Sequence, residues 1–130
     1  MGTRCLTHVK DGNKKAVTLV TIYRQYDGYP KGHGQELKKL FGNTEIINGI
    51  GAKQKAPKFA NTMSCFAAQL IGKLKDGIGN IYIYPANSKD CGEEYTYTLY
   101  ESEGEVFIVV YDVYDEKILY DGKLSGFDAE

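Results

Sequence analysis

The 130-residue sequence has no tryptophan, three prolines and two histidines. Long hydrophobic runs are also missing: the longest apolar stretches, such as 107–111, fall far short of the roughly 18–20 residues that span a bilayer. The N-terminal MGTRCLTHV lacks the apolar core of a secretory signal. We therefore expect no membrane segment and a cytoplasmic protein.

Cysteine is scarce as well. The three cysteines, Cys5, Cys65 and Cys91, are an odd number and form no C-x-x-C pair. The only other soft metal ligands, His8 and His33, lie far apart in the sequence. We expect reduced thiols, no bound metal and no cofactor.

Classical catalytic motifs are absent too. The chain contains no G-x-S-x-G elbow, no H-E-x-x-H, no Walker A sequence and no G-x-G-x-x-G. Cys5 and Cys65 fall among apolar positions, which favours packed thiols over nucleophiles. Glu93 and Glu94 are adjacent on an expected strand, so they point to opposite faces and do not form an acid/base pair. We predict a protein that is not an enzyme.

What the sequence does contain is a hydrophobic fraction of 42%, eleven tyrosines and an uneven distribution of charge. These values predict one folded domain over 1–130. Residues 1–89 hold 14 Lys/Arg and 5 Asp/Glu, whereas residues 90–130 hold 2 and 12, so the two parts carry +9 and −10. A basic part suggests an anionic partner, and an acidic part disfavours a long nucleic acid. A small anion such as a nucleotide satisfies both; alternatively, the two parts neutralise each other across the fold.

The periodicity of apolar residues predicts the secondary structure. Helical spacing predicts helices at 34–41 and from Asn61 or Thr62 to near Asp76 and Gly77, separated by an irregular stretch at 43–58. Strands are expected at 3–10, 16–25, 80–84, 94–100, 105–112 and 117–121. This grouping predicts an α+β fold with the order ββααββββ, in which two helices pack on one face of an antiparallel sheet of about six strands.

The segment YRQYDGYPKGHG at 23–34 is the first candidate binding element. Arg24 is a forked cation and Gln25 an amide donor, and both are followed by Tyr26 and Asp27. Glycines then bring backbone amides to a helix start, where His33 could donate to an anion or lie in solvent. The pattern suits phosphate and base recognition; the alternative is an aromatic-rich turn in which Arg24 pairs with Asp27.

A second candidate is the strand–loop–strand segment IYIYPANSKDCGEEYTY at 81–97. Tyr84 could stack on a base, and Asn87 could read a base edge. The alternative is a hairpin stabilised by cross-strand tyrosine pairs. A third element is the glycine-rich 48–51, whose backbone N–H groups could serve phosphate, with three lysines following at 53, 55 and 58 that could equally form a solvated loop.

Medium-length blocks of this sequence resemble the Thoeris anti-defence 1 family. The blocks are MGTRCLTHV, YRQYDGYPKGHG, AAQLIGKLKDG with IYIYP, and DCGEEYTY, and together they run along most of the chain. The resemblance implies a phage-encoded sponge that sequesters glycocyclic ADP-ribose isomers in the host bacterial cytoplasm without cleaving them. For some members it also implies binding of the cyclic oligonucleotides of CBASS at separate sites, and it implies homo-oligomers from dimers to hexamers.

The resemblance also implies which residues contact the nucleotide. Arg24 and Gln25 carry over as pocket residues, with Tyr84 as the stacking candidate and Asn87 as the polar one. Residues 90–130 contain no arginine, so a family contact from an arginine on a late strand has no counterpart here. Two other functions stay open: a nucleotide-processing enzyme such as a cyclic phosphodiester hydrolase, and an interaction module that uses its tyrosine-rich surface.

Overall fold

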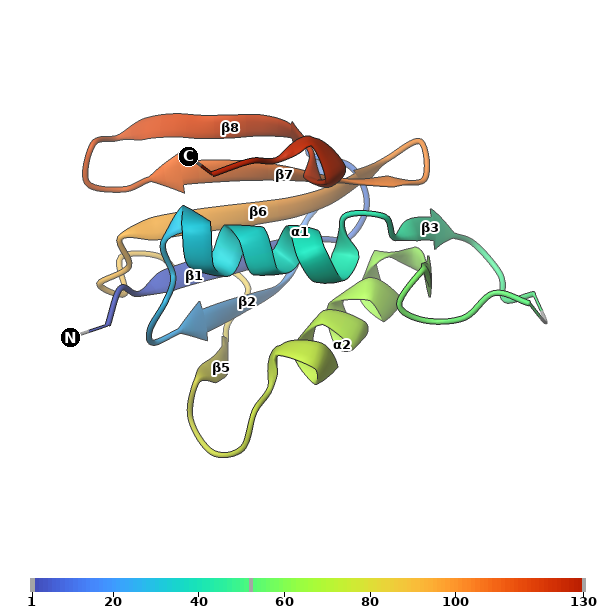
Figure 1. Cartoon of the computed structure of the whole chain (residues 1–130), viewed down its shortest axis with the longest axis horizontal. Coiled ribbons are helices and arrows are strands. Elements are labelled where there is room, and N and C mark those ends of the chain that lie inside the picture. Colours follow the sequence, from blue (N-terminus) through green and yellow to red (C-terminus); the bar gives the residue numbers. More distant parts are fainter. Residues whose placement is uncertain (1, 52, 130) are drawn as a thin grey trace.

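Residues 2–51 and 53–129, which the computed structural model describes, form eight strands and two α-helices (Figure 1). The strands are β1 (Cys5–Lys10), β2 (Thr18–Arg24), β3 (Glu45–Ile47), β4 (Phe59–Asn61), β5 (Ile81–Tyr84), β6 (Tyr95–Ser102), β7 (Glu105–Asp112) and β8 (Lys117–Lys123). The helices are α1 (Gln35–Phe41) and α2 (Thr62–Leu74), with a π-helical turn η1 (Pro30–Gly34) before α1 and a 3₁₀ turn η2 (Leu124–Gly126) after β8.

One mixed sheet holds all these strands. Its order is β4-β3-β7-β6-β1-β2-β5, and β8 pairs with the remaining length of β7. Most neighbours are antiparallel, but β1 runs parallel to β6 and β3 runs parallel to β4. The expectation of a purely antiparallel sheet of about six strands is therefore wrong. Apolar alternation marks a strand but does not identify its neighbour, so the pairing of β1 with a strand from the far end of the chain left no local signal.

The stretch at 43–58, which was expected to be irregular, contains the first of the two additional strands. β3 and β4 are three residues each, too short to show an alternating pattern. β3 is tied to the turn between β6 and β7 because Ile46 N–H donates to the carbonyl of Gly104 at 2.7 Å. The predicted order ββααββββ is thus corrected by two strands inserted between the helices.

Other parts of the prediction are confirmed. The fold is α+β, all six expected strands exist, and both helices lie where the apolar spacing placed them. α2 buries Met63, Phe66 and Leu70 on one face, as the period of 3.6 residues requires. The loop expected before α1 differs in part, because its last residues form the π-helical turn η1.

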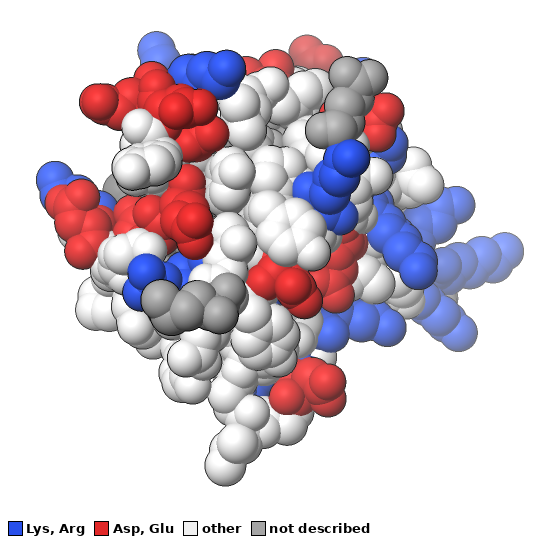
Figure 2. Space-filling model, turned by 60° about the vertical axis from the view of Figure 1, so that its left-hand side comes forward, with Lys and Arg blue, Asp and Glu red and all other residues white. Residues whose placement is uncertain are grey.

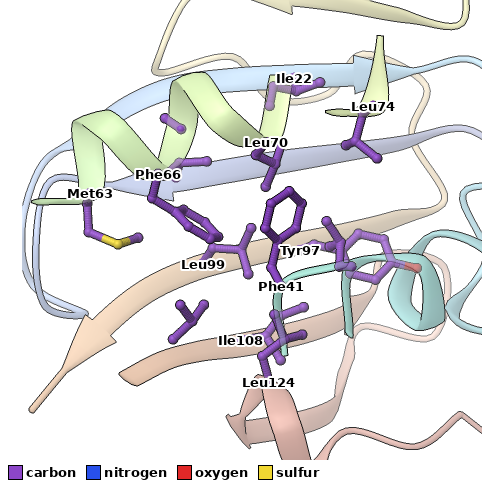
Figure 3. Close-up of a cluster of buried hydrophobic side chains, with 14 of the residues drawn as sticks. Ile22, Phe41, Met63, Phe66, Leu70, Leu74, Tyr97, Leu99, Ile108 and Leu124 are labelled. Atoms are coloured by element: carbon purple, nitrogen blue, oxygen red, sulfur yellow. The ribbon is translucent and has the colours of Figure 1, made fainter. Parts of the chain in front are cut away.

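Both helices cover the same face of the sheet (Figure 1). Phe41 of α1 meets Phe66 of α2 edge to face at 5.3 Å between ring centroids, and both rings are fully buried. Around them lie Tyr97 and Leu99 of β6 and Ile108 of β7, so the core fills the space between helices and sheet (Figure 3). Burial of one such side chain contributes about 1.5–3 kcal/mol to stability.

No helix within residues 2–51 and 53–129 covers the opposite face of the sheet. The connection from β5 to β6 contacts this face, where Thr21 Oγ1 donates to the carbonyl of Ala86 at 2.8 Å. The Thr21 hydroxyl therefore accepts from Nδ1 of His8, which lies 2.7 Å away. Leu6, on the same face as His8, is fully buried.

Charge is unevenly spread over the surface. On the face that Figure 2 shows, several basic side chains gather at the right-hand edge, while acidic side chains gather mainly at the left, with a few basic ones among them. The uneven charge along the sequence is therefore visible on the fold.

The longest helix in the described residues is α2, with 13 residues, and no helix in those residues is long and apolar enough to cross a membrane.

Candidate functional site

Arg24 is held in place by three contacts at the end of β2. Its Nε–H donates to the carbonyl of Tyr26 at 2.8 Å, and its NH1 donates to Nδ1 of His33 at 3.0 Å. The same NH1 forms an ion pair with the Glu36 carboxylate. The Arg24 side chain is 13% exposed, so the guanidinium is fixed by the protein while part of it faces solvent.

His33 supports Arg24 from behind. The imidazole is fully buried and touches the ring of Tyr97 edge to face, with 4.8 Å between the centroids. Burial, with a further contribution from the Arg24 charge, lowers the pKa of His33 to about 3. The ring is therefore neutral at pH 7. Because Nδ1 accepts from Arg24, Nε2 carries the proton and donates to Thr7 Oγ1 at 2.7 Å.

The glycines of the 23–34 segment make this arrangement possible by close packing. A Cβ on Gly28 would lie 2.8 Å from the Cβ of Cys5, and one on Gly34 would lie 2.7 Å from the ring of Phe127. The Gly28 carbonyl also accepts from the Tyr97 hydroxyl at 2.6 Å. Glycine at these two positions lets the loop before η1 pack against β1 and the end of η1 pack against Phe127. His33 lies in the same turn, in contact with Arg24.

A hollow of about 410 Å³ opens beside the guanidinium. Its lining combines three cations with two carboxylates and one aromatic ring: Arg24, Asp27, Tyr29, Lys31, Gly32, Gln35, Glu36, Lys39 and Leu40. The Tyr29 side chain is 41% exposed and offers a ring to a ligand. The volume and the charges suit a small phosphorylated molecule.

The residues expected from the 23–34 segment have separate places around this hollow. Arg24 and Asp27 line it, but Gln25 is exposed outside the lining and Tyr26 contributes its carbonyl to Arg24. His33 lies behind the guanidinium and does not line the hollow. The expected alternative of an ion pair between Arg24 and Asp27 is not what forms, because the Arg24 partner is Glu36.

Several lining residues were missed by the sequence reasoning. Tyr29 and Lys31 belong to the quoted segment, yet only its first residues and His33 were selected. Gln35, Glu36 and Lys39 belong to α1. Glu36 had a usable signal, since it is the first acidic residue of a helix that follows a block rich in cationic and aromatic residues.

Tyr84 and Asn87 do not join this hollow. In the register of β2 and β5, Thr21 pairs with Tyr84 and Arg24 pairs with Ile81, so Arg24 and Tyr84 point to opposite faces of the sheet. Tyr84 stacks on Tyr23, with 5.1 Å between centroids and 3° between planes. Asn87 is exposed in the loop after β5. The structure therefore separates the two candidate elements.

The third candidate element uses its amides internally. Gly49 N–H donates to the Asn61 side chain at 2.7 Å, and Gly51 N–H donates to the Gln54 side chain at 2.7 Å. These two donors are therefore not directed at a ligand. The charged residues of the 48–58 loop are its three lysines, at 53, 55 and 58.

The environment of Cys5 is that of a structural residue. Cys5 is buried, and burial raises the pKa of its thiol to about 12.

Another hollow, larger than the one beside Arg24 at about 530 Å³, is lined by Arg4 with Glu93 and Glu94. It has one cation against two carboxylates and suits an anion less well than the hollow beside Arg24. No group of three His, Cys, Asp or Glu side chains that could hold a metal is found in residues 2–51 and 53–129.

Comparison of the chain with known proteins gives no relative. No protein-family model, no curated protein and no solved structure matches it.

Proposed function

We propose that the protein binds and sequesters a small signalling nucleotide of the cyclic ADP-ribose kind, such as a glycocyclic ADP-ribose isomer, without cleaving it. The observation that carries this proposal is the Arg24 guanidinium, fixed by Tyr26, His33 and Glu36 at the edge of a hollow that also holds Lys31 and Lys39. The resemblance of the sequence to the Thoeris anti-defence 1 family supports the choice of nucleotide. In this proposal the protein acts in the cytoplasm of a host bacterium as a phage anti-defence protein.

The hollow has a role for each part of such a ligand. The guanidinium binds phosphate oxygens, and the two exposed lysines add positive charge around the pyrophosphate. The ring of Tyr29 stacks on the base. Asp27 and Gln35 provide a carboxylate and an amide for hydroxyl groups or a base edge.

Sequestration rather than turnover is supported by the state of the buried reactive groups. His33 is neutral and has both ring nitrogens in hydrogen bonds, so it cannot take a proton from water. The thiol of Cys5 stays protonated at neutral pH because its pKa is raised by burial. Neither residue is in a state suited to activating a nucleophile, which supports sequestration.

Assembly into a homo-oligomer, a dimer or a hexamer, is part of the proposal. Among the described residues, β5 pairs only with β2 and β8 pairs only with β7, so each has a free edge to which another chain could add. The uneven surface charge provides complementary patches for a second copy. Sedimentation that shows a 14.5 kDa species at micromolar concentration and low salt contradicts this part.

The function is tested by recovery of the ligand. The purified protein is incubated with glycocyclic ADP-ribose isomers, linear ADP-ribose and cyclic oligonucleotides, and the free nucleotide is measured by chromatography before and after heat denaturation. A sponge depletes one class of nucleotide and releases it unchanged after heating. Recovery of a product identifies a hydrolase instead, and no depletion of any nucleotide overturns both nucleotide-based functions and leaves the interaction module.

A further inference from the structure

The ion pair beside the hollow joins one fixed partner to one movable partner. Arg24 is 13% exposed and is also held by the Tyr26 carbonyl and by His33. The Glu36 side chain is 41% exposed, and within residues 2–51 and 53–129 its carboxylate has Arg24 as its one hydrogen-bond partner. A change of rotamer releases Glu36 into solvent at the cost of one contact. Release of Arg24 would break three contacts, so Glu36 is the partner that moves.

The position of Glu36 is also the position that an anionic ligand would take. A guanidinium binds carboxylate and phosphate oxygens in the same forked manner. Arg24 NH1 already divides its two hydrogens between His33 and Glu36, and NH2 has no acceptor among the described residues. A phosphate that approaches NH2 therefore meets the carboxylate at NH1, and the two like charges repel each other.

We propose that Glu36 is the specificity-determining residue of this site: its carboxylate occupies Arg24 as a built-in anion, and a ligand binds by exchanging its phosphate for this carboxylate. The proposal rests on the proposed function only for the choice of the Arg24 hollow as the binding site. After the exchange, NH1 and NH2 face the phosphate together, and Lys31 and Lys39 lie around the same hollow.

The exchange selects ligands by charge. A phosphate or pyrophosphate group brings more negative charge than Glu36 and gains more from the surrounding lysines, so it displaces the carboxylate. A ligand whose only anionic group is a carboxylate offers Arg24 nothing that Glu36 does not already supply. Glu36 thus keeps the site closed to simple carboxylates.

The test uses inorganic pyrophosphate and acetate as probes, with binding measured by titration calorimetry at constant ionic strength. Glu36→Gln removes the competing charge and keeps the shape of the side chain. We expect it to raise the association constant for pyrophosphate about fivefold, the effect of removing a competing ion pair worth about 1 kcal/mol. It should also make acetate binding measurable. A folding defect lowers affinity, so a gain cannot arise from damage to the structure.

Matched variants separate this exchange from a general effect of charge. Glu103→Gln removes the same charge from an exposed position in the turn between β6 and β7, and should leave the association constant within about twofold. Adding Arg24→Ala to Glu36→Gln should abolish the gain. Equal or weaker pyrophosphate binding by Glu36→Gln overturns the exchange, and so does the absence of binding by both this variant and the wild-type protein.

Failure of the exchange and failure of the proposed function give different results. If glycocyclic ADP-ribose is retained and Arg24→Ala releases it, but Glu36→Gln does not strengthen pyrophosphate binding, the function stands and the exchange is wrong. If pyrophosphate behaves as expected but no ADP-ribose isomer is retained, the exchange stands and the nucleotide assignment is wrong.

Discussion

The hollow beside Arg24 and the cluster of Tyr23, Tyr82 and Tyr84 on the other face of the sheet both contain tyrosine but use it differently. In the cluster, Tyr23 stacks on Tyr84 and also meets Tyr82 at 6.0 Å between centroids. Contact between these rings covers part of their surfaces, so that part is not open to a ligand. At the hollow, Arg24 is oriented in part by the fully buried His33, and the ring of Tyr29 remains exposed.

The difference shows what distinguishes a binding element from a stabilising one. Aromatic residues on neighbouring strands stabilise a sheet by contacting each other across the strands. A binding site instead needs side chains that buried residues hold in position and that still expose binding groups to solvent. Arg24, which is held by His33, has this arrangement. The residue types alone do not distinguish a binding element from a stabilising one. The contacts that these residues make in the fold do distinguish them.

The largest expected effect is on ligand binding by Arg24→Ala. Removal of a desolvated, hydrogen-bonded guanidinium should weaken nucleotide binding by about 2–4 kcal/mol, measured by calorimetry. Arg4→Ala is the matched control, because Arg4 is exposed and does not line the hollow. Equal affinity in the Arg24→Ala and wild-type proteins would move the binding site away from this hollow.

The next effect concerns His33 and pH. Its pKa is about 3 in the folded protein against an ordinary value of 6.5, so between these values the unfolded chain binds a proton that the folded chain does not. The stability due to the neutral His33 is complete above about pH 6.5 and is lost as the pH falls toward about 3.

His33→Gln isolates this contribution. Glutamine supplies an uncharged acceptor for Arg24 and a donor for Thr7 without titrating. We expect a loss of about 2 kcal/mol at pH 7 from the change of shape in the core. Wild type loses about 1.4 kcal/mol for each pH unit below 6.5 as its unfolded chain takes up a proton, so this deficit should disappear at about pH 5 and reverse at pH 4. Urea denaturation at both pH values measures it. A difference that grows as the pH falls would show that His33 is charged in the folded protein.

A smaller effect is expected at Tyr29. Tyr29→Ala should weaken nucleotide binding by about 1–2 kcal/mol through loss of base stacking, whereas Tyr29→Phe keeps the ring and most of the affinity. Tyr26→Ala is the control, because the Tyr26 ring is exposed but outside the hollow, and its contact with Arg24 is made by the main chain. If Tyr26→Ala weakens binding more than Tyr29→Ala, the sequence-based choice of Tyr26 is the better one.

The parts of the fold that the sequence predicted are those with a repeating local pattern. The α2 helix has apolar residues at helical spacing over three turns, and β7 has a continuous apolar run from Val106 to Tyr111. The short strands β3 and β4 were missed because three residues are too few to show an alternating pattern, and they pair with each other and, through β3, with the distant β7. The parallel pairing of β1 and β6 was missed for the same reason.

The candidate site shows the same limit. The 23–34 segment was selected from its residue types, and it does provide Arg24 and Asp27 to the hollow. The burial of His33 depends on Thr7 of β1 and Tyr97 of β6, outside the segment. The ion-pair partner of Arg24, Glu36, also lies outside the segment, on α1. A sequence pattern indicates which residues can bind a phosphate, whereas the packing decides which of them face solvent.

The smallest expected effect distinguishes the two regions most directly. Tyr84 packs its ring on Tyr23, so Tyr84→Ala should reduce the free energy of unfolding by about 1 kcal/mol, the value of an aromatic pair on a sheet surface. Tyr84→Phe keeps the ring and should be nearly neutral. Neither variant should change nucleotide affinity, because Tyr84 and Arg24 point to opposite faces of the sheet. Urea denaturation and calorimetry on the same samples separate the two quantities. If Tyr84→Ala weakens binding while stability is unchanged, the ligand lies on the tyrosine face and the hollow beside Arg24 is a structural feature.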